Sequence, residues 1–339
     1  MHSQAEQRFR CSLCGRTFSF RAGTLFFRCR TDPQVIVQVL TLLAYGCPIP
    51  AIEAAFGFQR RTVRSWLAAA GSHAERLHTE LVEGERSLGQ VQADELCVKL
   101  QRKRYWLAMA VAVEFRLWLG AIVGEQREKG LLRALAMRVR ACLKEGPLLV
   151  CVDGLRGYAQ AFRWALCTQV TTPRGGRPRR VAWRELVIGQ VIKRREQHRL
   201  VEVSRKIVQG TSAAAKRLLV STQQQGVINT AYIERLNATF RARLAVLGRR
   251  TRSLARQPQA LRRAVYFLGA VYNFCSEHAS LTLPSGQRRT PAMAAGITDH
   301  CWSMGELLWH RVAPPPWTPP KRRGRPSKAL KELLHRWAT

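Results

Sequence analysis

The spacing of apolar residues divides this chain of 339 residues into a helical part and a part rich in strands. In residues 33–78 apolar positions recur at helical intervals. These intervals predict three short helices, 33–46, 50–56 and 59–70. Gly71 is expected to end the third helix, since glycine readily adopts the left-handed conformation that closes a helix. The pattern is typical of a helix-turn-helix, and the alternative is an ordinary helical hairpin with a basic surface.

From residue 88 the pattern changes to that of strands joined by turns. Val, Leu and aromatic residues predict three successive strands, 89–100, 105–113 and 115–123. The elements expected next are a helix over 127–143, a short apolar strand over 148–152 and a helix over 158–166. Strand–strand–strand–helix–strand–helix is an α/β order, so the predicted fold class is α/β.

The second half of the chain combines a basic segment with two well-patterned helices. Residues 171–215 are expected to form a basic insertion or a hairpin that includes a strand over 186–192. Apolar residues share one face of a helix predicted over 229–247. A further helix, 258–274, is expected to pack behind it, and a Pro-rich segment from residue 313 leads into a basic tail.

The charge of the chain indicates an anionic partner. There are 56 Lys and Arg against 22 Asp and Glu, which gives a formal net charge of +34. Such a surplus repels itself in a compact state unless an anion shares the surface, and nucleic acid is the leading candidate ahead of an anionic membrane surface. The largest local surplus lies in residues 235–263, which hold nine arginines and no acid. A solvated helix normally mixes both signs, so this run is expected to face phosphates.

A membrane span and a secreted, disulfide-bonded protein are both disfavoured. The longest apolar stretch, 106–123, contains Glu114 and Arg116, which are costly at bilayer depth. The first 30 residues hold six arginines and no uninterrupted apolar segment of the kind found in signal peptides. The ten cysteines are scattered, several of them within apolar runs, as expected for reduced thiols in the cytoplasm.

Two cysteines near the N-terminus allow two interpretations. Cys11 and Cys14 form a CxxC knuckle, which is half of a tetrahedral Zn²⁺ site. The nearby Cys29 and His2 could add ligands, but neither belongs to a second CxxC. The alternative is a vestigial knuckle packed against neighbouring phenylalanines. Residues 1–32 are therefore predicted to be a partial zinc-ribbon-like knuckle, with zinc either bound or lost.

Three carboxylates stand in unusual positions for a chain with so few acids. Asp94 lies inside a strand pattern, Asp153 follows the short apolar strand, and Glu234 interrupts a basic helix. Carboxylates from these elements could converge on two Mg²⁺ or Mn²⁺ ions, an arrangement that supports phosphodiester displacement. The alternatives are a turn at Asp153 and an ion pair with a nearby arginine at Glu234. Glu95 could replace Asp94 as a ligand, but alternation along the strand places it on the opposite face.

Two basic sites are candidates for contacts with DNA. The first two turns of the third predicted helix present four polar side chains, Arg60, Arg61, Thr62 and Arg64. These are the turns with which a recognition helix contacts bases and phosphates. In the tail, Arg323 and Arg325 belong to an Arg-Gly-Arg-Pro sequence similar to an AT-hook, which fits a narrow minor groove. The alternative for the tail is a solvated basic linker.

Seven short segments can be compared with a known protein family. They are 8–18, 62–66, 92–96, 152–154, 229–237, 272–278 and 290–296. On these segments the chain resembles bacterial insertion-sequence transposases of the DDE type, and within them the insertion-sequence-one group. The resemblance covers roughly residues 8–310, and the Glu-Arg-x-Asn sequence at 234–237 with its trailing arginines is its most specific part.

The resemblance implies a ribonuclease-H-like catalytic domain over residues 88–280, with Asp94, Asp153 and Glu234 as its metal-binding triad. It implies an enzyme that binds the ends of its element as double-stranded DNA, cuts the DNA and joins it to a target. Such a protein would be bacterial, cytoplasmic and nucleoid-associated, and would act as a homo-oligomer on DNA.

The resemblance also assigns the contact with the element end to Asn237, Arg241 and Arg243. His278 matches a histidine of the family, without a role attached to it. Residues 281–339 would be a C-terminal extension. Because the zinc ribbon is shorter than is usual in the family, a catalytically inactive, transposase-derived DNA-binding repressor is one alternative. A structure-selective nuclease that shares the fold is another.

Overall fold

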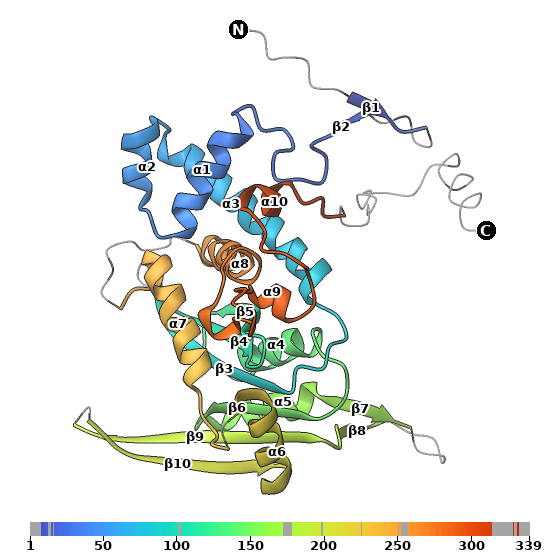
Figure 1. Cartoon of the computed structure of the whole chain (residues 1–339), viewed down its shortest axis with the longest axis vertical. Helices are drawn as coiled ribbons and strands as arrows, with labels where there is room; N and C mark the ends of the chain where they lie inside the picture. Colours follow the sequence, from blue (N-terminus) through green and yellow to red (C-terminus); the bar gives the residue numbers. More distant parts are fainter. Residues whose placement is uncertain are drawn as a thin grey trace.

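The computed structural model describes residues 8–12, 15, 17–100, 103–171, 178–197, 199–224, 226–249, 251, 257–313, 328 and 331. Within these ranges the chain is a mixed α/β protein with a six-stranded mixed sheet and ten α-helices (Figure 1). The α/β class predicted from the pattern is therefore confirmed. Cys14, Arg323 and Arg325 lie outside the described residues, so the complete knuckle and the AT-hook-like motif stay predictions. No helix among the described residues is long and apolar enough to cross a membrane.

The central sheet is built around β3, in the strand order β10-β9-β6-β3-β4-β5. Its strands are β3 (Gln90–Leu100), β4 (Lys103–Ala112), β5 (Leu117–Gly124), β6 (Leu148–Asp153), β9 (Leu186–Glu196) and β10 (Arg199–Gln209). β3, β4 and β5 form an antiparallel meander. β6 and β9 are added parallel to β3 on its other side, and β10 pairs antiparallel with β9 at the edge.

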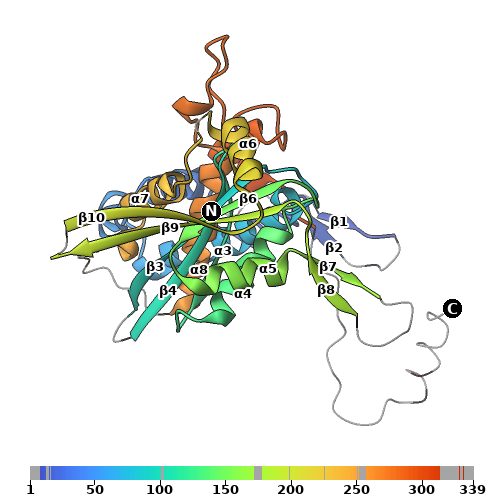
Figure 2. The ribbon, with the colours of Figure 1, turned by 90° about the horizontal axis from the view of Figure 1, so that it is seen from below.

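Helices cover both faces of the sheet. The helices are α1 (Pro33–Ala44), α2 (Ile49–Phe56), α3 (Arg60–Leu77), α4 (Lys129–Arg140), α5 (Arg156–Ala165), α6 (Ser212–Gln223), α7 (Ala231–Arg243), α8 (Pro258–Phe274), α9 (Pro291–Ala294) and α10 (Met304–Trp309). α4 and α5 lie on one face, and α6 and α7 lie on the other (Figure 2). Two small hairpins complete the fold, β1 (Arg8–Arg10) with β2 (Thr17–Ser19) and β7 (Cys167–Val170) with β8 (Arg179–Ala182).

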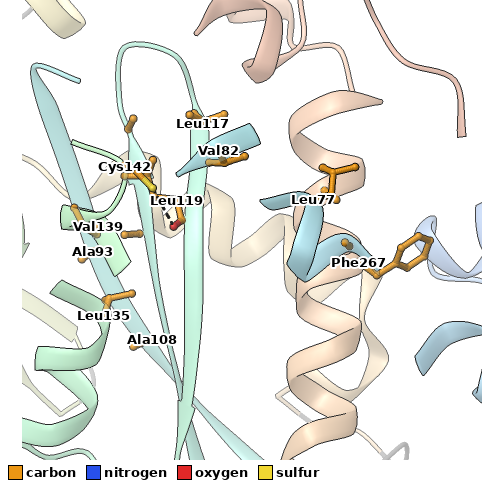
Figure 3. Close-up of a cluster of buried hydrophobic side chains, with 14 of the residues drawn as sticks. Leu77, Val82, Ala93, Ala108, Leu117, Leu119, Leu135, Val139, Cys142 and Phe267 are labelled. Carbon is orange, nitrogen blue, oxygen red and sulfur yellow. Dashed lines mark hydrogen bonds between the residues drawn. The ribbon is translucent and has the colours of Figure 1, made fainter. Parts of the chain in front are cut away.

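Alternation along β3 divides its side chains between two cores. Ala93 packs with Leu135 and Val139 of α4, as Figure 3 shows. Leu96, on the other face, packs with Phe240 of α7. A central strand that is buried on both faces in this way holds the two layers of helices at a fixed distance from each other.

The third helix does not end at Gly71, as the sequence predicts, but continues to Leu77. Gly71 is the point where α3 crosses α8, because a Cβ at this position would lie 2.3 Å from the carbonyl oxygen of Arg263. The absence of a side chain, rather than a left-handed backbone, is what the fold uses here. The prediction was wrong because a close helix crossing leaves no local signal in the sequence.

The segment predicted as a basic insertion contributes a strand to the central sheet. The predicted strand 186–192 extends to Glu196 as β9 and pairs along its first half with β6. Its polar second half is held by pairing with β10, which the apolar pattern did not predict. β9 and β10 form an antiparallel hairpin within this segment, as one of the two alternatives predicted for it, and β9 also joins the central sheet through β6. The predicted helix over 229–247 is shorter, since α7 begins at Ala231 and ends at Arg243.

Replacing Gly71 with alanine should destabilise the protein. The new Cβ would overlap the α8 backbone, and overpacking of this kind costs about 1–3 kcal/mol, more than the roughly 1 kcal/mol that alanine gains in helix propensity. Gly130→Ala is the matched control, because the nearest atom to a Cβ there is 4.0 Å away. Chemical denaturation should show a loss of stability for Gly71→Ala alone. Equal stability of the two variants would contradict the close crossing.

Candidate functional site

Asp94 and Asp153 are neighbours because β3 and β6 run parallel. Ala93 is paired with Val152, and the next residue on each strand is one of the two aspartates. Residues in equivalent positions of adjacent parallel strands point to the same side of the sheet. The sheet therefore sets the two carboxylates side by side.

Glu234 reaches the same place from the first turn of α7. A cleft of about 290 Å³ is lined by Asp94, Asp153 and Glu234, together with Lys193 and Thr230. The Thr230 hydroxyl donates a hydrogen bond of 2.8 Å to Glu234 Oε1, and the ammonium of Lys193 forms an ion pair with the same oxygen. The structure thus brings together the three carboxylates that the sequence singles out.

Glu95 does face the opposite side of β3, yet its carboxylate remains close to the other acids. It is 8% exposed and accepts a hydrogen bond from the hydroxyl of Tyr158 on α5. One carboxylate oxygen each from Asp94, Glu95 and Asp153 lie within 4.8 Å of one another. Among the described residues, these three are spaced closely enough to hold a metal ion. Glu234 lines the cleft together with Asp94 and Asp153.

Two cations that sequence reasoning missed neutralise part of this acidic charge. Arg127 forms ion pairs with Glu95 and, at 3.2 Å, with Asp153, and its guanidinium lies 5.1 Å from the centre of the Trp106 ring. Lys193 pairs with Glu234. No signal in the sequence distinguishes these two residues from the other cations of a chain with 56 Lys and Arg. Only the tertiary contact identifies them.

The electrostatics of the cleft favour an additional cation. Burial, followed by the charges of Glu95, Asp153 and Glu234, raises the pKa of Asp94 to about 7. The Asn237 amide donates a hydrogen bond of 2.8 Å to Asp94 Oδ2, which fixes the carboxylate in place. Several carboxylate oxygens with unrelieved mutual repulsion are a donor set that fits Mg²⁺ or Mn²⁺.

A buried glutamine on β3 fixes the position of α7. Gln92 Oε1 accepts hydrogen bonds from the backbone N–H groups of Tyr232 (3.0 Å) and Ile233 (3.1 Å), which belong to the first turn of the helix. Its amide nitrogen donates to the Asn229 carbonyl at 2.9 Å. Gln92 is thus a functional residue that sequence reasoning missed. Its signal was a polar side chain in a strand, two residues before Asp94 and on the same face.

The residues predicted to contact DNA through the helix-turn-helix lie at the start of α3. Three of the four are exposed and Thr62 is partly buried; the exposed ones are Arg60, Arg61 and Arg64. Arg60 forms an ion pair of 2.5 Å with Glu53 of α2. Val63 and Trp66 point into the core between the helices. The first turns of α3 therefore present Arg61 and Arg64 to solvent.

The three residues assigned to the element end do not share one exposed face of α7. Asn237 is 2% exposed, and its amide is occupied by Asp94. Arg241 is partly buried within the electrostatic reach of Asp94, and burial lowers its pKa. The guanidinium of Arg243 lies 4.8 Å from the centre of the ring of Tyr45, the residue that follows α1.

The N-terminal cysteines supply no complete metal site within the described residues. Cys11 precedes the turn of the β1–β2 hairpin, and Cys14 is not described. The Cys29 thiol is partly buried and donates to the Leu25 carbonyl at 3.6 Å. Zinc binding by the knuckle stays a prediction.

No protein-family model and no curated protein matches this chain. What can be concluded about the cleft therefore comes from its own geometry and charge.

Replacing Asp94 with asparagine should stabilise the metal-free protein in a pH-dependent way. The folded state raises the pKa of Asp94 from 3.8 to about 7, so the folded protein holds this proton more tightly than the unfolded chain. The resulting penalty is small at pH 4, grows between about pH 4 and pH 7, and stays at about 4 kcal/mol above pH 7. Thermal unfolding should therefore show Asp94→Asn more stable than wild type at pH 8 and similar at pH 4.

The control for this experiment is Glu85→Gln, which removes an exposed carboxylate outside the cleft. Mg²⁺ should raise the unfolding temperature of the wild type and have little effect on Asp94→Asn. An Asp94→Asn variant less stable than wild type at pH 8 would contradict the repulsion described.

Proposed function

We propose that this protein is a DDE-type DNA transposase, which binds the ends of its element, cuts the DNA and joins it to a target. The observation that carries the proposal is the convergence of Asp94, Asp153 and Glu234 on one cleft from two parallel strands and a helix. Arg127 and Lys193 offset only part of the repulsion among these carboxylates, and a bound divalent metal would offset the rest.

The strand order supports a ribonuclease-H-like core. An antiparallel meander, β3 to β5, is followed by strands added parallel to β3, with helices on both faces. This is the order that the resemblance implies for the catalytic domain. The two aspartates then fall on the adjacent parallel strands β3 and β6, where a crevice forms beyond the carboxyl end of β6.

Asp94, Asp153 and Glu234 would hold the metal ions of such an enzyme. Two bound Mg²⁺ or Mn²⁺ ions supply activation of a water or 3′-hydroxyl and stabilisation of the departing oxygen in phosphodiester displacement. Asn237 keeps Asp94 oriented, and Lys193 brings a positive charge to the rim of the cleft, where a phosphate backbone would pass.

Duplex DNA as the partner is supported by charge and by the helix-turn-helix. The formal net charge is +34, and the exposed Arg61 and Arg64 lie where a recognition helix contacts its site. A repressor derived from a transposase would need these features but not three carboxylates in one cleft. The acidic cleft therefore favours the enzyme over the repressor.

The test of catalysis uses the DNA that flanks the gene on both sides, labelled at its ends, with Mg²⁺ or Mn²⁺. Wild type should release cut ends and produce joined product. Asp153→Asn should reduce both by at least about a hundredfold, because a metal ligand is lost. Glu85→Gln, which removes an exposed carboxylate away from the cleft, should retain activity.

The outcomes separate the three candidate functions. Binding of the flanking DNA without cleavage or joining would contradict the transposase and favour the repressor. Cleavage without joined product, under the same conditions, would favour a nuclease.

The recognition helix has a separate test by salt titration. Arg61→Ala and Arg64→Ala should each weaken DNA binding and reduce the slope of log affinity against log salt by about 1, as expected for loss of one phosphate contact. Arg184→Ala is the control, because this exposed arginine precedes β9, at the end of the sheet opposite to Asp153. Unchanged affinity and slope in both α3 variants would show that the recognition helix is assigned wrongly.

A further inference from the structure

Arg116 has a backbone conformation that arginine rarely adopts. It lies in the turn between β4 and β5 with φ of 56°, in the left-handed region. The side chain is partly buried, and burial lowers its pKa. Strained positions of this kind persist where the surrounding structure holds them, and they concentrate at binding sites.

Contacts from two other segments hold the Arg116 guanidinium in place. It lies over the Tyr232 ring at 4.2 Å from the centroid, and Nε donates to Ser280 Oγ at 3.4 Å. Nη1 donates to the Val113 carbonyl. These hydrogen bonds use only some of the five N–H donors of the Arg116 guanidinium. The remaining N–H groups are held in position and have no anionic acceptor among the described residues.

A second arginine approaches from the end of α7. Arg243 lies 4.8 Å from the centre of the Tyr45 ring, and its Nη1 donates to Ser276 Oγ at 3.3 Å. Ser276 and Ser280, which accept from the two arginines, flank His278 in the sequence. Both guanidinium groups are thus hydrogen-bonded to one short segment, residues 276–280.

An aromatic pair belongs to this group. The rings of Tyr272 and His278 meet edge to face, with their centroids 4.7 Å apart. Arg116 and Arg243 both act electrostatically on Tyr272 and on His278, and Arg235 acts on Tyr272. Burial, with these neighbouring positive charges, lowers the pKa of His278 to about 4, so the imidazole is neutral at pH 7 and can donate one N–H.

The positive charges of this group have no acidic partner in the described part of the chain. None of Arg116, Arg235 and Arg243 lies within ion-pair distance of a carboxylate there. Arg116 and Arg243 are held in place by aromatic rings and serines, without a counter-charge among the described residues, which matches the way proteins prepare a site for phosphate oxygens.

We infer that Arg116, Arg243 and His278 form a binding site for the backbone phosphates of a DNA strand on its way to the acidic cleft. Tyr232, under Arg116, is two residues from Glu234 on α7, and Tyr45, under Arg243, is at the end of α1. The site therefore lies between the helix-turn-helix and the cleft. The inference rests on the proposed function for the identity of the anion as DNA.

The dimensions agree with a strand lying along α7. Tyr232 and Arg243 are eleven residues apart, about three turns, so they share one face of the helix over about 16 Å. That length corresponds to about five nucleotides of one strand at 3.4 Å each. The site also gives His278 a role, as a neutral donor of a hydrogen bond to a phosphate oxygen.

The experiment measures DNA binding in the Asp153→Asn background, without divalent metal, so that cleavage does not enter. Arg116→Asn removes the guanidinium and inserts a residue that tolerates the left-handed backbone. Affinity should fall about tenfold and the salt slope by about 1. Thermal unfolding without DNA should show that the variant still folds, because relief of the backbone strain offsets part of the contacts that the guanidinium loses.

Two further variants and one control complete the test. Arg116→Lys keeps the charge but loses the planar fork, and should restore the salt slope more than the affinity. If Arg116→Asn does not fold, DNA affinity and its salt slope are measured for His278→Gln instead. Its affinity should fall, and its salt slope should stay unchanged. Arg184→Ala, on the opposite end of the sheet, should change neither.

The inference is overturned if folded Arg116→Asn binds DNA with unchanged affinity and salt slope, or if His278→Gln does so when Arg116→Asn is unfolded. Its failure is distinct from failure of the proposed function. A protein that cuts and joins DNA without needing Arg116 would overturn the phosphate site alone. A protein that needs Arg116 for binding but never cuts DNA would overturn the transposase alone.

Discussion

α7 is attached to β3 by two amide side chains, and the acidic cleft depends on this attachment. Gln92 accepts two backbone N–H groups of the first helical turn, and Asn237 donates to Asp94. Both amides are almost completely buried, so breaking either leaves a polar group unsatisfied at a cost of about 1–3 kcal/mol. Since β3 carries Asp94 and α7 carries Glu234, these hydrogen bonds fix the relative position of two carboxylates that come from distant parts of the chain.

The carboxylates that these hydrogen bonds hold together repel one another. Three carboxylates line the cleft and a fourth, Glu95, lies close to two of them, in a chain with only 22 Asp and Glu; Arg127 and Lys193 neutralise them in part. The raised pKa of Asp94 reflects the negative charge that these two cations leave uncompensated. On the other side of α7 the imbalance has the opposite sign, because Arg116 and Arg243 are held by aromatic rings and serines rather than by acids. One helix therefore separates a site suited to cations from a site suited to phosphates.

Much of the fold was predictable because periodicity is a local property. The helix 258–274 was predicted with the bounds of α8, and the three strands of the meander were found within a few residues of their ends. The errors occur where a neighbour overrides the local pattern. Gly71 has the sequence signal of a helix stop, but α8 makes it a crossing point. The polar half of β9 has no strand signal, and pairing with β10 makes it a strand.

For the candidate site, too, local properties could be predicted and contacts between distant segments could not. The sequence by itself determined which carboxylates are unusual and, through alternation, that Asp94 and Glu95 point to opposite faces of one strand. Only the tertiary structure decided that Asp153 stands next to Asp94, that Glu95 remains close to both, and that Arg127 is their counter-ion. The physical reason is the distance along the chain over which each property is determined. Side-chain direction follows from backbone geometry within a few residues, whereas strand neighbours, ion pairs and the burial that shifts a pKa arise from contacts between segments distant in the chain.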